Sequence, residues 1–440
     1  MGKWKKVRIG EFLTERQGRY KPDDNAIVTY KRLDKIDFSG TIHISEKPSK
    51  TDMIVVQPGD LVISGINVAK GAIAVYQGTE PVTATIHYSS YIFDDSVVDL
   101  EYFKYFVKSP AFIETLKKQV KGGIKTEIKP KVFLPLEISL PDLPTQKQIV
   151  KRISVNLKRV NELAKEIETQ KGYTKLLRQN ILQDAIEGKL TADWRKEHPV
   201  QKGNPDYDAE ALFELIQKER KVDKKRKALP PILDAEKPFE LPAGWKWVRL
   251  GEICNSITDG DHLPPPKQPS GIPFVVISDI SSGKIHFRNK RFVSRDYFNK
   301  LPREKIPETG DILYTVTGSY GIPVPVNDFQ FCVQRHIGII KPVHLIKDFL
   351  FFSLMSPICK KQADGVAWGV AVKTIPIKEL RNFMIPLPPL AEQKQIVDTV
   401  SGIFDNISSL EKQISQQEEY INQLIKSILK DTLKVNYGTN

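Results

Sequence analysis

The stretch that decides the fold reads Pro386-Leu387-Pro388-Pro389-Leu390-Ala391-Glu392-Gln393-Lys394-Gln395-Ile396-Val397. Its prolines stop the preceding segment, and a long segment that is poor in glycine and rich in Gln, Glu and Lys follows. The same transition occurs 247 residues earlier, where Leu140-Pro141 precedes Gln146-Lys147-Gln148-Ile149-Val150. The chain therefore passes twice from an irregular part into a long predicted helix.

This repeat extends over most of the chain. The matching pairs are Val7-Arg8-Ile9-Gly10-Glu11 with Val248-Arg249-Leu250-Gly251-Glu252, Gly59-Asp60 with Gly310-Asp311, Ser109-Pro110 with Ser356-Pro357, and Ile181-Leu182 with Ile428-Leu429. From Ser109 onward the separation stays at 247 residues. A constant separation over this length indicates two copies of one structural plan.

The composition is that of a globular protein. The 440 residues have a formal net charge of +13, with 40% hydrophobic and 27% charged residues, which predicts two or three domains and excludes a disordered or collagen-like chain. Cys254, Cys332 and Cys359 lie too far apart for a Cys-x-x-Cys site, so we expect three reduced, packed thiols. No apolar run is long enough to cross a membrane, and the lysines at the start precede no apolar stretch, so we expect a cytoplasmic protein.

The first part of each copy combines strand and helix patterns. Short β-like runs include Met53–Val56, Leu61–Ser64 and Phe274–Ile277, and helical patches span Leu100–Val120 and Asp348–Ala363. This mixture predicts a compact α+β domain in each copy.

The second part of each copy repeats apolar residues every three or four positions. In the second copy they are Ile396, Val400, Ile403, Ile407, Leu410, Ile414, Ile421, Leu424 and Ile428. Sustained heptads predict a supercoiled helix with a partner, about 50 Å long, and the nearest partner is the other helix. The alternative is one amphipathic helix lying on its own domain, which would have a wider and shorter stripe.

An antiparallel helix pair would relate the copies by a pseudo-twofold axis and would need only a modest linker. We therefore predict an α+β protein in which two mixed α/β domains are joined by two long helices that form an antiparallel coiled coil. The expected segments are a first domain at 1–143, a central helix at 144–190, a linker at 191–244, a second domain at 245–390 and a C-terminal helix at 391–435. We expect the basic run near 218–227 to be a solvated spacer, with contact to nucleic acid as the alternative.

The excess of basic charge favours a polyanionic partner, and glycine-containing loops with cations and hydroxyls could grip phosphates and reach base edges. The candidate DNA-binding residues are Lys31, Arg32, Lys70, Lys121, Lys125, Lys129, Ser319, Tyr320, Arg335 and Lys373. Simple β-turns are the alternative for the loops at 64–71 and 315–321. His87 and His336 occupy similar places in the two copies, and we expect both to be buried imidazoles with satisfied hydrogen bonds, with contact to bases as the alternative.

Motifs for catalysis are absent from the sequence. There is no Gly-x-x-x-x-Gly-Lys-Ser/Thr loop for ATP, and the histidines show no metal-binding spacing. Asn204-Pro205-Asp206-Tyr207 matches an amino-methyltransferase signature at three of four positions, but it follows a polar segment and no loop for a methyl donor accompanies it. We therefore predict no catalytic residue and no metal site.

The plan resembles the specificity subunit of Type I restriction-modification enzymes. The segments that carry the resemblance are Trp245–Ile253 with its first-copy twin, 386–397, Ile181–Thr191 and Leu241–Trp245. The first copy departs from the family pattern at Thr145, where Glu usually precedes Gln, and this affects the expected interaction at the start of that helix.

The resemblance implies a DNA-reading scaffold without chemistry of its own. Each α+β domain would be a target recognition domain that reads one half of a bipartite site. The helices would dock two methyltransferase subunits, which bring S-adenosylmethionine, and two restriction/translocase subunits would bring ATP and Mg²⁺. The residues expected to bind partners are Gln146, Gln393, Ile396, Ile407 and Ile414. The alternatives are a coiled-coil adaptor that binds only proteins and a solitary regulatory or anti-restriction DNA-binding protein.

Overall fold

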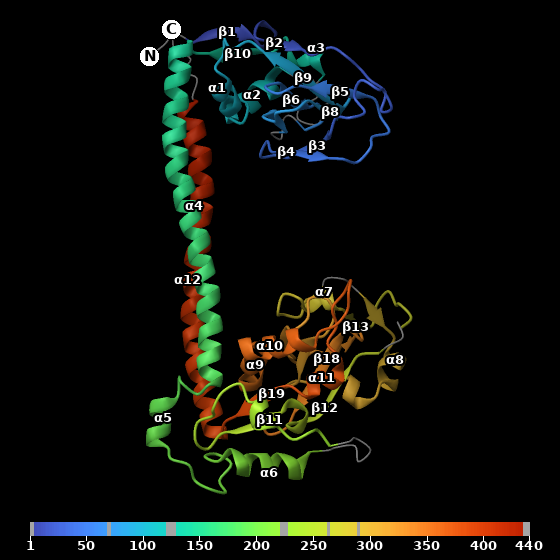
Figure 1. The fold of residues 1–440 in the computed structure, drawn as a ribbon, viewed down its shortest axis with the longest axis vertical. Helices are drawn as coiled ribbons and strands as arrows, with labels where there is room; N and C mark the ends of the chain where they lie inside the picture. Colours follow the sequence, from blue (N-terminus) through green and yellow to red (C-terminus); the bar gives the residue numbers. More distant parts are fainter. Residues whose placement is uncertain are drawn as a thin grey trace. The chain divides into compact units, whose positions relative to one another are not determined.

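Two long helices, α4 (Leu143–Ile186) and α12 (Leu390–Thr432), begin at the two proline-rich transitions. The structure is a computed structural model that describes residues 4–67, 72–119, 129–220, 228–261, 265–287 and 291–433. It separates into two units, which are residues 1–169 with 414–440 (unit 1) and residues 170–413 (unit 2). Each unit therefore contains one mixed part and a section of both long helices, and the α+β class is confirmed (Figure 1).

Unit 1 contains three small sheets and three short helices. Its strands are β1 (Lys5–Arg8), β2 (Leu13–Glu15), β3 (Arg32–Ile36), β4 (Ile42–Ser45), β5 (Met53–Val56), β6 (Leu61–Ser64), β7 (Ile73–Val75), β8 (Val82–Thr85), β9 (Tyr88–Phe93) and β10 (Glu137–Leu140). They form the sheets β1-β10, β2-β9-β6-β7 and β4-β3-β8-β5. The helices are α1 (Leu100–Phe106), α2 (Pro110–Gln119) and α3 (Pro130–Phe133). Aromatic residues of α1 pack with β6 and β9 in one core that also takes in the start of α4.

Unit 2 repeats this plan with additions. Its strands are β11 (Lys246–Arg249), β12 (Cys254–Asp259), β13 (Ile272–Val275), β14 (Phe292–Val293), β15 (Ile312–Thr315), β16 (Pro323–Pro325), β17 (Cys332–Val333), β18 (Ile337–Pro342) and β19 (Met384–Leu387). The sheets are β11-β19, β12-β18-β15-β16 and β14-β13-β17. The helices are α5 (Ala192–Glu197), α6 (Ala209–Glu219), α7 (Ile277–Ile280), α8 (Arg295–Lys300), α9 (Lys347–Met355), α10 (Pro357–Val366) and α11 (Ile377–Arg381).

Some predicted elements differ from the observed ones. Each expected helical patch is two helices, because a serine ends one helix and caps the next: Ser109 Oγ accepts the N–H of Phe112, and Ser356 Oγ accepts the N–H of Cys359. The β-like run at 274–277 ends at Val275, and Ile277 instead begins α7. The three cysteines are buried and unbridged, as expected. No helix in the described ranges has the length and apolar character to cross a membrane.

A buried glutamine fastens each long helix to the mixed part that precedes it. Gln146 Nε2 donates to the carbonyl of Pro141 (2.8 Å), and its Oε1 accepts the N–H of Asp99, the N-cap of α1 (2.7 Å). Gln393 makes the same pair of bonds, to the carbonyl of Pro388 (2.9 Å) and from the N–H of Ile346 (3.2 Å) at the start of α9. The sequence repeat is therefore also a repeat of individual side-chain contacts.

The aspartate of the repeated Gly-Asp pair closes the same turn in both units. Asp60 accepts the N–H of Gln57 (2.9 Å) and a two-pronged bond from Arg16 (2.6 and 2.8 Å). Asp311 accepts the N–H of Glu308 (2.8 Å) and pairs with Lys341. Burial raises the pKa of Asp311, and the ammonium group of Lys341 opposes that rise.

In each unit the start of one long helix packs against the end of the other. In unit 1, Ile149 and Ile153 of α4 share a core with Leu433, next to the end of α12. In unit 2, Leu182 of α4 clusters with Ile396 and Val400 of α12. Arg178 of α4 also donates to both carboxylate oxygens of Glu411 (3.1 and 2.9 Å) and lies over the Phe404 ring.

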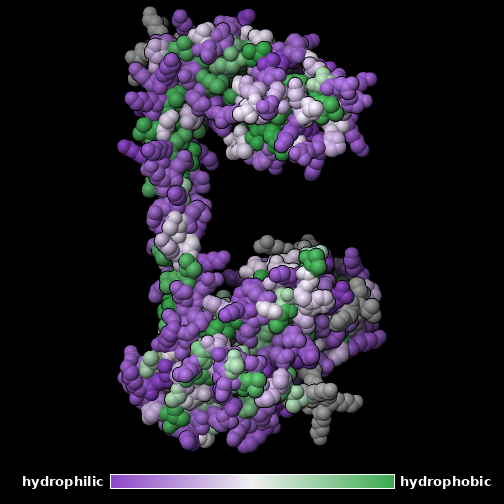
Figure 2. Space-filling model, viewed as in Figure 1, coloured by the Kyte–Doolittle hydropathy of each residue, from purple (hydrophilic) through white to green (hydrophobic). Residues whose placement is uncertain are grey.

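Away from the helix starts, the heptad pattern is buried mainly at one of its two positions, whereas at the starts Ile149 and Ile396 of the other position are buried as well. The first position is buried in unit 1 at Ile153, Val160, Ile167 and Ile414, and in unit 2 at Thr174, Val400 and Ile407. Leucines of the second position stay exposed in unit 1 at Leu163 (53%) and Leu424 (44%), and in unit 2 at Leu177 (43%) and Leu410 (44%). Figure 2 shows hydrophobic residues among hydrophilic ones on the visible face of these helices. Two helices alone therefore cover half of the apolar seam.

The linker, which belongs to unit 2, packs tightly against α12 and the second mixed part of that unit. The buried carboxylate of Glu392 accepts bonds from Thr191 Oγ1 (2.7 Å), Trp245 Nε1 (2.7 Å) and Arg195. The apolar face of α6 joins the core of unit 2 through Ala209, Leu212 and Ile216. The position equivalent to Glu392 in unit 1 is occupied by Thr145. In unit 2 the residue at this position therefore attaches the linker as well as standing at the start of a helix. The end of the basic run, 221–227, lies outside the described residues.

We expect Gln393→Ala to lower the free energy of unfolding by about 1–3 kcal/mol, because it leaves a buried carbonyl and a buried N–H without partners. Denaturant titration followed by tryptophan fluorescence would measure the change. Gln395→Ala is the matched control, since the amide of Gln395 bonds within its own helix, to Thr399 (3.4 Å), and we expect a loss of less than about 0.5 kcal/mol. Equal losses in the two variants would contradict the role given to Gln393.

Candidate nucleic-acid interface

Three surface loops of unit 2 are joined by backbone hydrogen bonds into one platform, which comprises residues 316–321, 334–336 and 368–374. Val316 N–H donates to the carbonyl of His336 (3.1 Å), and Gly318 N–H donates to that of Lys373 (2.9 Å). Trp368 and Thr374 exchange two bonds (3.1 and 2.8 Å), which closes the third loop as a hairpin. The loops leave the ends of β15 and α10, so rigid elements support a protruding surface.

A chain of polar side chains runs across this platform. His336 Nδ1 lies 3.0 Å from Thr317 Oγ1, which also accepts the hydroxyl of Thr374 (3.3 Å). Arg335 Nε donates to His336 Nε2 (3.5 Å). Because an arginine N–H can only donate, this contact requires Nε2 of His336 to act as the acceptor, and Nδ1 would then donate toward Thr317. His336 is half-buried and His87 is exposed, so the expectation that both are buried is wrong.

A second cluster borders the first. Tyr320 donates its hydroxyl to Asp364 (2.8 Å), and Lys360 both binds Asp364 (2.7 Å) and lies 4.2 Å from the centre of the Tyr320 ring. Lys360 and Tyr320, with the more distant charge of Lys373, lower the pKa of Asp364 and keep it ionised. This hydrogen bond to Asp364 in turn raises the pKa of Tyr320.

The rim of the platform offers both cations and apolar side chains. Ser319, Arg335 and Lys373 are exposed. Trp368 is 68% exposed, and Val370 and Val372 are also exposed on the hairpin. Large apolar side chains that lie together on a surface often mark a binding site. Cations, hydroxyls and an aromatic ring on one rigid surface fit a nucleic acid, in which phosphates are anionic and bases have apolar faces.

Four of the ten predicted DNA-binding residues therefore come together in unit 2, namely Ser319, Tyr320, Arg335 and Lys373. The sequence reasoning missed Thr317, Thr374, Lys360 and Asp364. The first two lie in loops that it had marked, and the Lys360–Asp364 pair has the i,i+4 spacing of a helical ion pair, which was an available signal.

In unit 1 the matching surface is described only in part. Gly65 N–H donates to the carbonyl of His87 (3.0 Å), as Val316 does to His336 in unit 2. Lys70, Lys121 and Lys125 lie outside the described residues. Lys129 is exposed and is the N-cap of α3.

Lys31 and Arg32 stand on a different element, at the start of β3. Lys31 lies 3.6 Å from Glu46, and Arg32 binds Asp34 and the carbonyl of Pro48. Neighbouring acids therefore offset both positive charges, which weakens the case for these two residues as phosphate ligands.

The five residues expected at a partner interface are all buried: Gln146, Gln393, Ile396, Ile407 and Ile414. Their contacts lie within this chain, which leaves little of their surface for a second protein. Their role in binding partners stays a prediction, and the exposed leucines of the seam are better placed for it.

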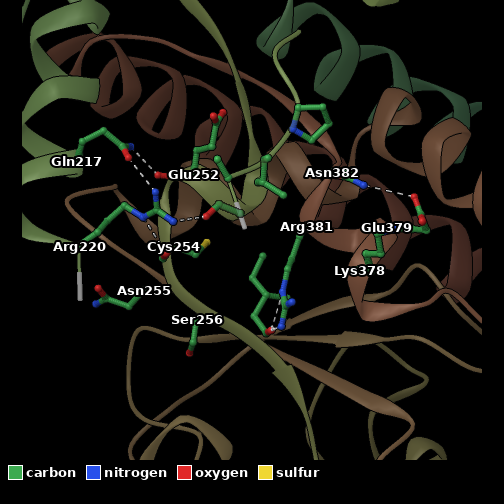
Figure 3. Close-up of a pocket in the computed structure, with 15 residues that line it drawn as sticks. Gln217, Arg220, Glu252, Cys254, Asn255, Ser256, Lys378, Glu379, Arg381 and Asn382 are labelled. Atoms are coloured by element: carbon green, nitrogen blue, oxygen red, sulfur yellow. Dashed lines mark hydrogen bonds between the residues drawn. The ribbon is translucent and has the colours of Figure 1, made fainter. Parts of the chain in front are cut away.

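A cavity of about 610 Å³ lies where the linker meets the second mixed part, within unit 2 (Figure 3). Arg220, at the end of α6, donates to the carbonyls of Gly251 (2.6 Å) and Cys254 (3.1 Å). Arg381, at the end of α11, donates to the carbonyl of Ile257 (2.6 Å). These arginines bind main-chain oxygens around β12, so they hold the linker and sheet together.

Comparison with known proteins shows which family this chain resembles. The family model described as "Type I restriction modification DNA specificity domain" matches residues 242–420. The chain is 25% identical over 326 residues to the Type I restriction enzyme EcoBI specificity subunit of Escherichia coli, covering 73% of this chain and 62% of that one. It is 28% identical over 294 residues to the EcoEI specificity subunit of Escherichia coli, covering 62% and 48%.

These matches span less than two thirds of the two relatives. One solved structure that this chain resembles is described as the "structural basis underlying complex assembly and conformational transition of the type I R-M system". The alignment covers 98% of this chain and 97% of that chain, with a TM-score of 0.62 and 21% sequence identity. These values indicate a shared fold. Residues 242–420 therefore match the Type I restriction modification DNA specificity domain, and the chain is similar to the specificity subunits of Type I restriction enzymes.

Proposed function

We propose that this chain is the non-catalytic, sequence-specific DNA-binding subunit of a Type I restriction-modification complex. The observation that carries the proposal is the platform of unit 2, where Arg335, Lys373 and Trp368 surround a set of hydroxyl groups on a rigid base. Residues 1–143 and 245–390 would be target recognition domains, each reading one half of a bipartite DNA site.

The helices would form an antiparallel coiled coil that relates the two recognition domains by a pseudo-twofold axis. The packing of helix start against helix end in each unit supports this arrangement. Rigid helices could set the separation between two readers on the duplex, where half-sites about one helical turn apart lie about 34–36 Å from each other on the same face.

The exposed leucines of the heptad seam would dock the methyltransferase subunits. An apolar seam on a helix is normally covered by a partner, and Leu177 and Leu410 of unit 2 are left uncovered by their own chain. We place the partner contact at these leucines and their counterparts in unit 1, Leu163 and Leu424, and not at the buried isoleucines.

The chemistry would belong entirely to the partners. Two methyltransferase subunits would bring S-adenosylmethionine and flip an adenine from each half-site into their own pockets. Two restriction/translocase subunits would bring ATP and Mg²⁺. Such a complex acts on cellular DNA, so a cytoplasmic location is part of the proposal.

Lys373→Ala should weaken DNA binding and make the affinity less sensitive to salt. Loss of one phosphate contact lowers the slope of log affinity against log salt concentration by about 0.9. Fluorescence anisotropy with a random duplex at several salt concentrations would measure it. Lys196→Ala removes an exposed lysine on α5 and should leave the slope unchanged. An unchanged slope for Lys373→Ala would mean that this lysine faces away from DNA.

Replacing residues 245–390 with those of a relative should change one half of the methylated sequence and leave the other half intact. Each recognition domain makes its own base contacts, so specificity should move with the domain. Sequencing of methylated adenines in cells that also express the partner subunits would show the outcome. A change in both halves would contradict independent reading.

Leu177→Glu combined with Leu410→Glu should reduce co-purification with the methyltransferase subunit at least about 10-fold, because it places charge in an apolar contact. DNA binding by the isolated chain should persist, since the seam is separate from the platform. Lys412→Glu is the control, because it lies two residues from Leu410 and so points about 200° around the helix. Normal co-purification of the double variant would place the partner elsewhere.

A further inference from the structure

We infer that Arg335 is a base-reading side chain of unit 2, that it selects guanine in one half-site, and that His336 positions it. This inference rests on the proposed function as a DNA reader. It goes further by assigning one specificity contact to one side chain and by naming the residue that orients it.

The backbone beneath Arg335 is fixed on both sides. Gln334 N–H donates to the carbonyl of Val275 in β13 (3.0 Å), and Ile337 N–H donates to the carbonyl of Gln334 (3.0 Å). The second bond closes a β-turn with Arg335 at its first central position, between β17 and β18. Arg335 therefore projects from a short, anchored turn and not from a mobile loop.

The charge of Arg335 is left available. Among the contacts of the described residues, its guanidinium meets His336 through Nε and pairs with no acid. Two arginines of unit 2 that do pair with carboxylates are Arg195, with Glu392, and Arg249, with Glu236. Because Arg335 is exposed and its contact is at Nε, its two terminal nitrogens could bind a ligand as a fork.

His336 connects this fork to the rest of the platform. Its Nε2 accepts from Arg335, and its Nδ1 lies 3.0 Å from Thr317 Oγ1, which Thr374 also contacts. The arginine is thereby linked to all three loops of the platform without losing its charge. His336 would act as a positioning residue, because it contacts Arg335 and not the DNA.

The fork geometry selects the base. In the major groove, guanine presents its O6 and N7 as two adjacent acceptors, and an arginine fork binds both at once. Adenine presents a donor in place of O6, so the same fork discriminates against it. A bidentate contact of this kind is typically worth about 10-fold to 100-fold in preference for the correct base.

The test is a binding selection from a randomised duplex library, using the full chain with its methyltransferase subunit. Arg335→Ala should abolish a guanine preference at one position in one half-site, by about 10-fold or more, and leave the other half-site unchanged. Arg335→Lys keeps the charge but not the fork and should restore the preference only weakly. Affinity for random duplex should fall little in either variant, in contrast to Lys373→Ala.

The positioning role has a separate readout. His336→Ala should weaken the same guanine preference, and His336→Gln, which keeps one acceptor and one donor, should recover part of it. Thr317→Val should act like a milder His336→Ala. Thermal unfolding of Arg335→Ala should match the wild type, because the side chain is exposed.

The outcomes separate the two proposals. If the wild type selects a sequence and Arg335→Ala selects the same one with the same strength, the inference is wrong and the proposed function stands. A wild-type complex without any sequence preference would overturn both. Loss of preference in both half-sites on Arg335→Ala would also overturn the inference, since it would indicate a structural effect.

Discussion

The structure depends on the buried amide that joins each long helix to its own mixed part. A glutamine side chain both donates and accepts, so one residue can satisfy a carbonyl at the end of the preceding proline turn and an N–H at the start of a short helix. Gln146 and Gln393 do this in the two units with partners at equivalent positions, which are Pro141 and Asp99 in unit 1 and Pro388 and Ile346 in unit 2. Since both groups are buried, the bond geometry determines the direction in which the helix leaves. Within a unit, the mixed part and its long helix keep a fixed orientation only if the junction between them is rigid.

The two copies differ where the linker attaches. In unit 2, Glu392 holds Thr191, Arg195 and Trp245, and the carbonyls of Pro205 and Asp206 accept the first N–H groups of α12, from Leu390 (3.1 Å) and Ala391 (3.2 Å). A helix start normally leaves these donors without partners, so the linker acts as a cap. In unit 1 the N–H of Thr145 bonds to Asp142 (2.9 Å) within the same segment. The departure at Thr145 thus reflects the absence of a linker to hold at that helix.

The sequence predicted what depends on local pattern. The proline stops and the glutamine-rich starts located the first residues of α4 and α12 to within one residue, although α4 ends at Ile186 and α12 at Thr432, before the expected ends at 190 and 435, and the Gly-Asp pairs located equivalent turns. It did not predict burial that depends on neighbours. The heptad spacing marks two apolar positions, but only the helix crossing determines that Ile407 is covered and Leu410 is not. Likewise, the charges of Lys31 and Arg32 are offset by acids that the fold of β3 and β4 brings close.

The platform of unit 2 shows why the residues proposed to contact DNA are harder to predict than the scaffold. Its members come from loops at 316–321, 334–336 and 368–374, which no short motif connects, and they meet because β15 and β18 pair side by side in one sheet. Backbone bonds between the loops position their side chains, so the side chains themselves are free to vary without loss of the fold. A protein that reads different DNA sequences on one scaffold needs this separation of tasks. The contacts that hold the platform are main-chain, and the groups that would face the bases, Arg335 first among them, contribute little to its stability.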